Sequence, residues 1–245
     1  ERLQGVLLTH FQSDHIAEIY EVNLGSWVSG RPTPLTVFGP TGVDEVIDGV
    51  NASYRLDRIY RTGHHGEALL APELGVLAHK TIAPGVIFED GDLKITAYVS
   101  EHPPIEPAVG YRFDYKGRSV VVSGDSNVNG DTREIVDGAD LLLHDALSVP
   151  TVTALSKAMG AAGRSRQSKI VSDVMDYHAS TDSLIELGEQ SNVDMVAFYH
   201  LVPVPLNAVL EDVFKRGMPE NFLLAEDLMS FELPIGSDEI VVNRP

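Results

Sequence analysis

Five apolar segments of this sequence are each followed by a residue that can bind a metal or transfer a proton. Chemically active groups gather where strands end, because the loops that follow a rigid sheet place them together. One convergent site explains five such endings better than five unrelated coincidences would. The residues that end these segments are His10, His102, Asp125, His144 and His200. This pattern constrains the fold most, since it requires the ends of several strands to meet.

The densest part of the pattern is the heptapeptide THFQSDH at residues 9–15, which follows the apolar run at 5–8. His10, Asp14 and His15 have side chains whose unprotonated forms donate lone pairs to a metal. The apolar run has the character of a short buried strand, and a helical pattern follows it. The sequence therefore predicts a metal site at the junction of a strand and a helix.

Predicted strands and helices alternate along the chain, which favours sheets flanked by helices and the α/β class. Strands are predicted at 35–38, 111–115, 118–123 and 193–200, with a hairpin turn at Lys116-Gly117. Helices are predicted at 15–24, 43–56, 181–190 and 206–216. Their expected boundary residues are Ser13 or Asp14 for the first, Ser180 or Thr181 for the third, and Gly217 for the end of the last.

The chain has 245 residues and 43% hydrophobic content, enough for a sizeable core in one large α/β domain. No repeat, low-complexity segment or charge block marks a linker, so residues 1–245 are predicted to form a single domain. The absence of cysteine excludes disulfides, thiolate metal sites and cysteine catalysis. No apolar run approaches the ~18 residues of a membrane helix, so no membrane partner is expected.

The net charge of −18 arises from 36 acidic and 18 basic residues. Proteins that bind nucleic acid draw much of their affinity from lysine and arginine, which usually form a basic patch. The only basic cluster in this sequence is short and consists of Arg164, Arg166 and Lys169. The charge therefore argues against nucleic acid as a partner and favours a small-molecule ester as substrate.

These motifs resemble those of the metallo-β-lactamase superfamily, in the branch that contains tRNase Z and the arylsulfatase-like hydrolases. The family's first metal motif, His-x-His-x-Asp-His, is similar to residues 10–15, and its later ligands match His102, Asp125 and His200. Two further signatures are similar to His144-Asp145-Ala146 and His178-Ala179-Ser180-Thr181. The arylsulfatase-like members also resemble the chain at 31–35, 64–66, 102–104 and 109–114. The resemblance covers nearly the whole chain.

The resemblance implies the αββα sandwich of the metallo-β-lactamase fold and two metal ions, expected to be zinc, with manganese or iron as alternatives. A zinc pair lowers the pKa of a bridging water and clamps an ester substrate, which suits hydrolysis. His10 and His102, assisted by Gln12, would hold one ion; Asp14, His15 and His200 would hold the other; and Asp125 would bridge them. By the same resemblance, His178 is oriented by Asp145 and protonates the leaving group, and Asp14 is counted with them as catalytic.

Two residues depart from the family pattern within the expected site. Gln12 stands where the family has its second histidine. Because an amide oxygen donates more weakly than imidazole, the first ion is expected to bind loosely. Asp145 is one methylene shorter than the family's usual glutamate, so its contact to His178 is open to either a direct or a water-bridged form.

The start of the chain also departs from the family. Relatives carry several strands before the first metal motif, whereas only four residues precede the apolar run here, so N-terminal strands of the fold are expected to be missing. Any targeting region would lie in that part, which leaves a periplasmic, secreted or cytoplasmic location open. Members of this branch are often dimers, and the resemblance implies a homodimer.

Three functions are compatible with these residues. The leading interpretation is a metal-dependent hydrolase of a small ester, such as an aryl sulfate or a phosphodiester. The alternative is a tRNA 3′-end endoribonuclease, supported by His178 and Asp145 but opposed by the charge. The third is a non-catalytic binding protein, in which Gln12 marks a decayed metal site.

Overall fold

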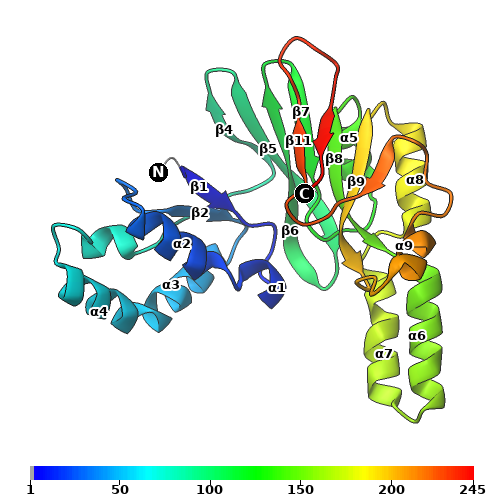
Figure 1. Ribbon diagram of the computed structural model, residues 1–245, viewed down its shortest axis with the longest axis horizontal. Helices are drawn as coiled ribbons and strands as arrows, with labels where there is room; N and C mark the ends of the chain where they lie inside the picture. The colour runs from blue at the N-terminus through cyan, green and yellow to red at the C-terminus, as the bar shows by residue number, and fades with distance from the viewer. Residues whose placement is uncertain (1–2) are drawn as a thin grey trace. The chain divides into compact units, whose positions relative to one another are not determined.

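The chain consists of two compact units, one ending at Ala83 and the other running from Pro84 to Pro245. The computed structural model describes residues 3–245, and Figure 1 shows both units with most of their helices and strands labelled. Each unit has its own sheet and its own buried core. The expectation of one domain over residues 1–245 stays a prediction.

The first unit is built on a three-stranded parallel sheet in the order β1-β2-β3. Parallel neighbours need long crossover connections, and helices supply them here. The strands are β1 (Gly5–Leu7), β2 (Thr36–Gly39) and β3 (Ala78–Thr81); the helices are α1 (Ser13–Ile16), α2 (Ile19–Val28), α3 (Val43–Ser53), α4 (Arg55–His65) and the 3-10 turn η1 (Pro72–Gly75). Their apolar sides meet in a core that includes Leu35, Val37 and Ile47, all fully buried.

Two helices of this unit differ from the prediction. The helix expected at 15–24 is divided into α1 and α2, and Gln12 rather than Ser13 or Asp14 is the N-cap of α1. The break at 17–18 resets the helical phase, so that α2 buries positions 19, 20, 23 and 27. The helix expected at 43–56 ends at Ser53, and α4 follows it after Tyr54. His64 and His65 lie in the last turn of α4.

The second unit is built on a seven-stranded mixed sheet in the order β10-β9-β8-β7-β6-β5-β4. The strands from β4 to β7 pair antiparallel, and those from β7 to β10 pair parallel. They are β4 (Gly85–Asp90), β5 (Leu93–His102), β6 (Ile105–Tyr115), β7 (Arg118–Val122), β8 (Leu141–Leu147), β9 (Met195–Val202) and β10 (Phe222–Leu224). The predicted hairpin is confirmed: Tyr115 pairs with Arg118, and the left-handed residues Lys116 and Gly117 form the turn.

Helices accompany the parallel half of this sheet. They are α5 (Gly130–Val136), α6 (Val149–Ala161), α7 (Ser165–Asp173), the 3-10 turn η2 (Val174–Asp176), α8 (Thr181–Gln190) and α9 (Ala208–Phe214). The N-cap of α8 is Ser180, whose side chain accepts a hydrogen bond from the Ser183 N–H. Ser180 is one of the two residues predicted for this position. Helix α9 is shorter than predicted: Asn207 is its N-cap, and Phe214 is its last residue. A small antiparallel pair, β11 (Ser230–Glu232) and β12 (Val241–Asn243), completes the unit.

The core of the second unit lies between its sheet and helices α5, α8 and α9. Val121, Leu142 and Phe198 project from the strands, and Leu184 and Phe214 meet them from the helices. All five side chains are fully buried. These sheets with their helices confirm the mixed α/β class. Among residues 3–245, no helix combines the length and apolar character that crossing a membrane requires.

Candidate metal centre

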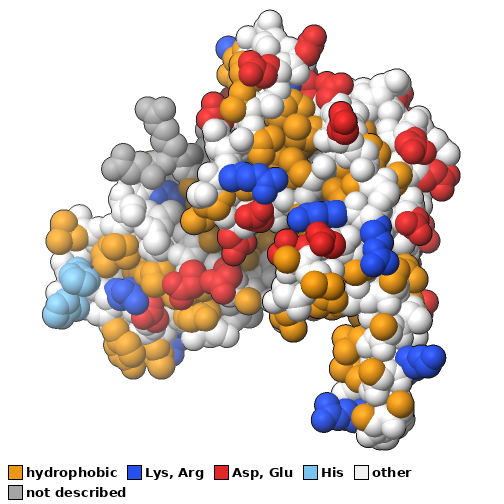
Figure 2. All heavy atoms as spheres, turned by 45° about the vertical axis from the view of Figure 1, so that its right-hand side comes forward, with side chains coloured by type: hydrophobic (Ala, Val, Ile, Leu, Met, Phe, Trp, Pro, Cys, Tyr) orange, Lys and Arg blue, Asp and Glu red, His pale blue; other side chains and the backbone are white. Residues whose placement is uncertain are grey.

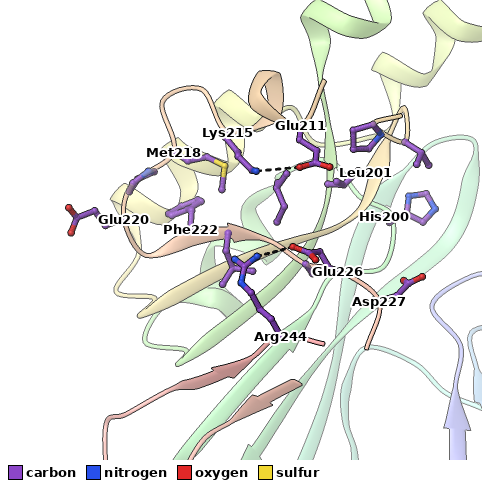
Figure 3. A pocket seen from close by; sticks show the side chains of 16 residues that line it. His200, Leu201, Glu211, Lys215, Met218, Glu220, Phe222, Glu226, Asp227 and Arg244 are labelled. Atoms are coloured by element: carbon purple, nitrogen blue, oxygen red, sulfur yellow. Dashed lines mark hydrogen bonds and ion pairs between the residues drawn. The ribbon is translucent and has the colours of Figure 1, made fainter. Parts of the chain in front are cut away.

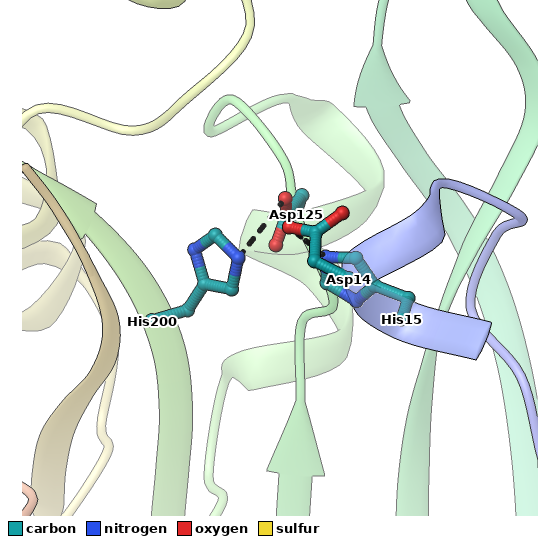
Figure 4. A group of neighbouring side chains, drawn as sticks. All are labelled: Asp14, His15, Asp125 and His200. Carbon is teal, nitrogen blue, oxygen red and sulfur yellow. Dashed lines mark ion pairs between the residues drawn. The ribbon is translucent and has the colours of Figure 1, made fainter. Parts of the chain in front are cut away.

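The first unit gathers four candidate ligands between the end of β1 and the end of α1. The His10 Nε2 atom lies 3.1 Å from the Gln12 Oε1 atom, and the rings of His10 and His15 have centroids 4.1 Å apart. The Asp14 Oδ2 and His15 Nε2 atoms are 3.6 Å apart, and both side chains are drawn in Figure 4. The short helix α1 thus keeps the predicted ligands of residues 9–15 close together within this unit.

The second unit delivers its candidate ligands at irregular positions of the sheet. The register of β5 and β6 shifts between Ser100 and His102, at the carboxyl end of β5. His200 has a left-handed φ of 43° at the point where the β8–β9 register skips a residue. A residue in such a bulge points its side chain away from the regular alternation of the strand. Asp125 follows β7 after Gly124, whose φ of 65° suits glycine.

Asp125 and His200 lie at a distance that suits a shared metal. The His200 Nε2 atom is 3.7 Å from the Asp125 Oδ2 atom, as the dashed line in Figure 4 marks. Ligand atoms that bind one zinc ion at about 2.0–2.2 Å must lie within roughly 4 Å of each other. Asp125 itself is 1% exposed. This donor pair fits a divalent ion.

His102 is held in the form that a metal requires. Its Nδ1 atom lies 2.8 Å from the backbone oxygen of Tyr177, so Nδ1 carries the proton and Nε2 keeps its lone pair. Burial lowers the pKa of His102, with a hydrogen bond to Tyr177 acting in the opposite sense. The neutral imidazole is therefore favoured, which is the protonation state of a metal ligand.

His178 and Asp145 form a direct hydrogen bond, and no water stands between them. The His178 Nδ1 atom donates to the Asp145 Oδ2 atom at 2.8 Å. His178 is 7% exposed and Asp145 is fully buried. The same histidine nitrogen is 3.9 Å from the Asp125 Oδ2 atom. The pair predicted from the sequence thus lies next to the carboxylate that was predicted to bridge the metals.

Two further groups hold Asp145 in place. The Ser126 N–H donates to Asp145 Oδ1 at 3.1 Å, and the His144 Nδ1 atom lies 2.9 Å from that same oxygen. His144 lies within β8 and is fully buried, which suits a role in supporting Asp145. Ser126 and the Tyr177 carbonyl were missed by the sequence reasoning. Only the position of Ser126 directly after Asp125 could have drawn notice to it.

A cavity of about 840 Å³ opens beside His200 in the second unit. Figure 3 shows its lining, which combines apolar side chains such as Met218 and Phe222 with two ion pairs. Arg244 contacts Glu226 at 2.8 Å, and Lys215 contacts Glu211 at 3.4 Å. The cavity provides room for a substrate next to a candidate metal ligand.

Curated relatives of the chain are ribonucleases. A ribonuclease Z of Mycobacterium bovis is 31% identical over 204 residues, which cover 82% of this chain and 68% of the relative. The expectation that the partner is a small molecule and not nucleic acid is therefore wrong. The physical reason is that net charge sums over a whole surface, whereas polyanion binding depends on local basic groups and bound cations. The arylsulfatase-like interpretation gains no support from this relative.

Solved structures show the same fold at lower sequence identity. The metallo-β-lactamase fold protein YhfI of Bacillus subtilis matches with a TM-score of 0.61 and 17% identity, covering 92% of this chain and 76% of that one. The short form of human tRNase Z matches with a TM-score of 0.53 and 19% identity, covering 82% and 73% of the two chains. These likenesses support the predicted metallo-β-lactamase fold.

The family model described as the beta-lactamase superfamily domain matches residues 1–200. That stretch contains every predicted metal ligand, from His10 to His200, and also Asp145 and His178. The match extends over most of the 245 residues. The chain belongs to the β-lactamase superfamily, as a hydrolase with the metallo-β-lactamase fold.

Proposed function

We propose that this chain is a metal-dependent phosphodiesterase that cleaves the 3′ extension of precursor tRNA, in the manner that the name ribonuclease Z describes. The observation that carries the proposal is the 2.8 Å hydrogen bond between His178 and the buried Asp145, beside Asp125. A phosphodiester of RNA has a poor leaving group, an alkoxide, and therefore needs a proton donor. The relationship to the mycobacterial ribonuclease Z supports the same reaction.

We further propose that each unit contributes candidate ligands for divalent ions, with zinc as the expected metal. His10, Asp14 and His15 would serve from the first unit, together with His102, Asp125 and His200 from the second. This division follows the order of the motifs in the sequence and the ligand chemistry found within each unit. When bound, the ions supply an activated water and positive charge for the phosphate.

His178 is the proposed proton donor to the leaving oxygen. Its Nδ1–H donates a hydrogen bond to Asp145, so Nε2 is the atom that would give a proton to the substrate. The Asp145 carboxylate stabilises the protonated imidazole and fixes its orientation. Ser126 and His144 position the carboxylate from its other oxygen, so Asp145 cannot turn away from His178 without losing those contacts. Asp14 is proposed to combine metal binding with acceptance of the proton of the attacking water.

Gln12 is proposed as a weak ligand of the first ion. Its Oε1 atom is 3.1 Å from His10 Nε2, a separation that two ligands of one ion can have. A neutral amide oxygen stabilises a divalent cation less than an imidazole does. We therefore expect bound ions to differ in affinity, with the one held by His10 and Gln12 leaving first.

The proposal is tested by offering the zinc-loaded protein four substrates in parallel: a precursor tRNA with a 3′ extension, an aryl phosphodiester, an aryl sulfate and a lactone. Cleavage of the precursor tRNA at the start of its extension, with weaker turnover of the aryl phosphodiester, is the expected result. Hydrolysis of the sulfate or lactone with the RNA left intact would overturn it. His178→Ala is the matched variant, because it should lose RNA cleavage while keeping its metal.

A further inference from the structure

The segment between Asp145 and Asp173 contains no acidic residue, although the chain as a whole carries a net charge of −18. Four basic residues lie within it, at positions 157, 164, 166 and 169. This segment forms helices α6 and α7, which were not predicted and which Figure 1 shows as a hairpin extending from the rest of the second unit. The segment is therefore locally cationic, although the protein as a whole is strongly acidic.

Hydrogen bonds join the two helices of the hairpin. The Ser156 hydroxyl donates to the Ser168 backbone oxygen at 2.8 Å, and the Ser168 hydroxyl donates to the Ser156 backbone oxygen at 2.8 Å. A Cβ atom at Gly160 would come within 3.3 Å of the Ser168 hydroxyl, so glycine allows the helices this close approach. Helix α6 has 13 residues, a length of about 20 Å. The hairpin therefore presents its charges on a rigid support.

The four basic side chains are exposed to solvent. Lys169 pairs with Asp173 one turn further along α7. Among residues 3–245, no carboxylate forms an ion pair with Lys157, Arg164 or Arg166. Figure 2 shows the hairpin at the lower right, where blue side chains are visible and red ones are not. The three unpaired cations are thus available to an anionic partner.

The two ends of the hairpin adjoin the two members of the His178–Asp145 pair. Helix α6 begins directly after β8, which carries Asp145, and η2 leads from α7 to His178. The Leu147 N–H donates to the Ala179 backbone oxygen at 2.7 Å, which joins the two ends. A polyanion bound along the hairpin would therefore extend from the neighbourhood of the reacting groups.

We propose that the α6–α7 hairpin binds the phosphate backbone of the RNA substrate and positions it for cleavage. This inference rests on the proposed function and names the surface that recognises the RNA away from the scissile bond. Arginine and lysine bind phosphates through charge and release counterions, which is independent of base sequence. The net charge of −18 argued against RNA binding. The hairpin removes this difficulty, because the RNA would contact a cationic surface and not the acidic remainder of the chain.

A second copy of the chain is the competing occupant of the hairpin. Leu155 is 36% exposed and Ile170 is 54% exposed, and an apolar face could pair with itself. Charge distinguishes the two occupants, since four cations facing four identical cations would repel. The experiment therefore measures oligomeric state beside RNA affinity.

The test is a binding measurement with fluorescently labelled precursor tRNA in the presence of a chelator, so that cleavage does not enter. The variant is Arg164→Gln with Arg166→Gln. The matched control is Lys94→Gln with Lys116→Gln, which removes the same charge from exposed positions near the β4–β5 and β6–β7 turns. Anisotropy is recorded from about 50 to about 200 mM salt, and sedimentation reports the oligomeric state.

The hairpin variant is expected to bind the RNA about tenfold more weakly or worse, with the slope of log K against log salt reduced by about 1.4 to 1.8. The control pair should keep the affinity within about twofold, and turnover of an aryl phosphodiester should be equal in all three proteins. Equal affinity of the hairpin variant and wild type, no measurable RNA binding by wild type, or a change of oligomeric state in the variant would each overturn the proposal. Wild type that cleaves the RNA while the hairpin variant binds it normally would refute the hairpin alone. Wild type that binds through the hairpin but never cleaves would refute the proposed function alone.

Discussion

Replacement of Asp145 by asparagine is the perturbation that bears most closely on the proposed chemistry. The carboxylate accepts from His178 Nδ1 at 2.8 Å and from the Ser126 N–H at 3.1 Å, and His144 Nδ1 lies 2.9 Å from it. An asparagine side chain has one accepting oxygen and one NH2 group that only donates. With the oxygen toward Ser126, the NH2 group faces His178 and removes the negative charge that stabilises its protonated form.

The size of the effect follows from that lost contact. A hydrogen bond to a charged group contributes about 1.5–3 kcal/mol, and about 1.4 kcal/mol corresponds to a tenfold change in rate. The lost bond alone therefore lowers kcat on RNA by about 10- to 150-fold. The donor-to-donor contact with His178 adds to this, within the 10²–10⁴ range that general acid catalysis covers. We expect a fall in kcat of about 10² or more, with zinc content unchanged.

Leaving-group dependence makes this prediction specific. An aryl phosphodiester with a nitrophenolate leaving group needs little protonation, so Asp145→Asn should slow its hydrolysis much less than that of RNA. Asp140→Asn is the control, because Asp140 is a structural carboxylate that pairs with Arg118 at 3.0 Å and accepts from the Ser119 hydroxyl at 3.0 Å. It should lower the free energy of unfolding without changing the ratio of the two rates. An equal loss on both substrates in Asp145→Asn would refute the role of His178 as proton donor.

The remaining predictions concern the metal ligands and the sheet. Gln12→His should raise the zinc content at limiting zinc or raise the rate, and no change in either would show that Gln12 does not limit the site. Asp125→Ala should lower bound zinc and abolish turnover, whereas unchanged turnover would contradict its role as a ligand. Gly110→Ala should lower the free energy of unfolding in urea by about 1–3 kcal/mol, because its Cβ would overlap the Tyr98 ring that lies across the β5–β6 pair. Gly49→Ala on α3, where nothing lies within 4 Å, should not destabilise the protein, and an equal loss in both variants would count against that reasoning.

The parts of the fold that local patterns determine were predicted from the sequence. The β6–β7 hairpin follows from Lys116-Gly117, whose left-handed conformation suits a two-residue turn. Ser180 was foreseen as one of two caps of α8, and the strands that lead to His102, Asp125 and His200 follow from their apolar runs. These features depend on neighbours in the chain, so sequence periodicity and turn chemistry carry enough information to place them.

Features that depend on distant residues were not predicted. The bulge at His200 arises from the pairing of β9 with β8, and the proton on His102 is fixed by the carbonyl of Tyr177, 75 residues away. Helices α6 and α7 were not predicted. Hydrogen bonds between Ser156 and Ser168 join them in the folded chain. The partner was predicted wrongly because the net charge was applied to the whole chain, whereas the segment between Asp145 and Asp173 contains basic residues and no acidic one. A sum over the sequence cannot report where on a surface the charges lie.

Metal dependence of precursor tRNA cleavage tests the proposed function without any substitution in the chain. The protein is stripped with a chelator, its metal content is determined, and cleavage of a precursor tRNA with a 3′ extension is followed as zinc is returned. We expect no cleavage by the stripped protein and recovery as up to two equivalents of zinc bind, with Asp125→Ala failing to recover. Cleavage that persists after the metal is removed, or a fully zinc-loaded protein that leaves the RNA intact, would contradict it.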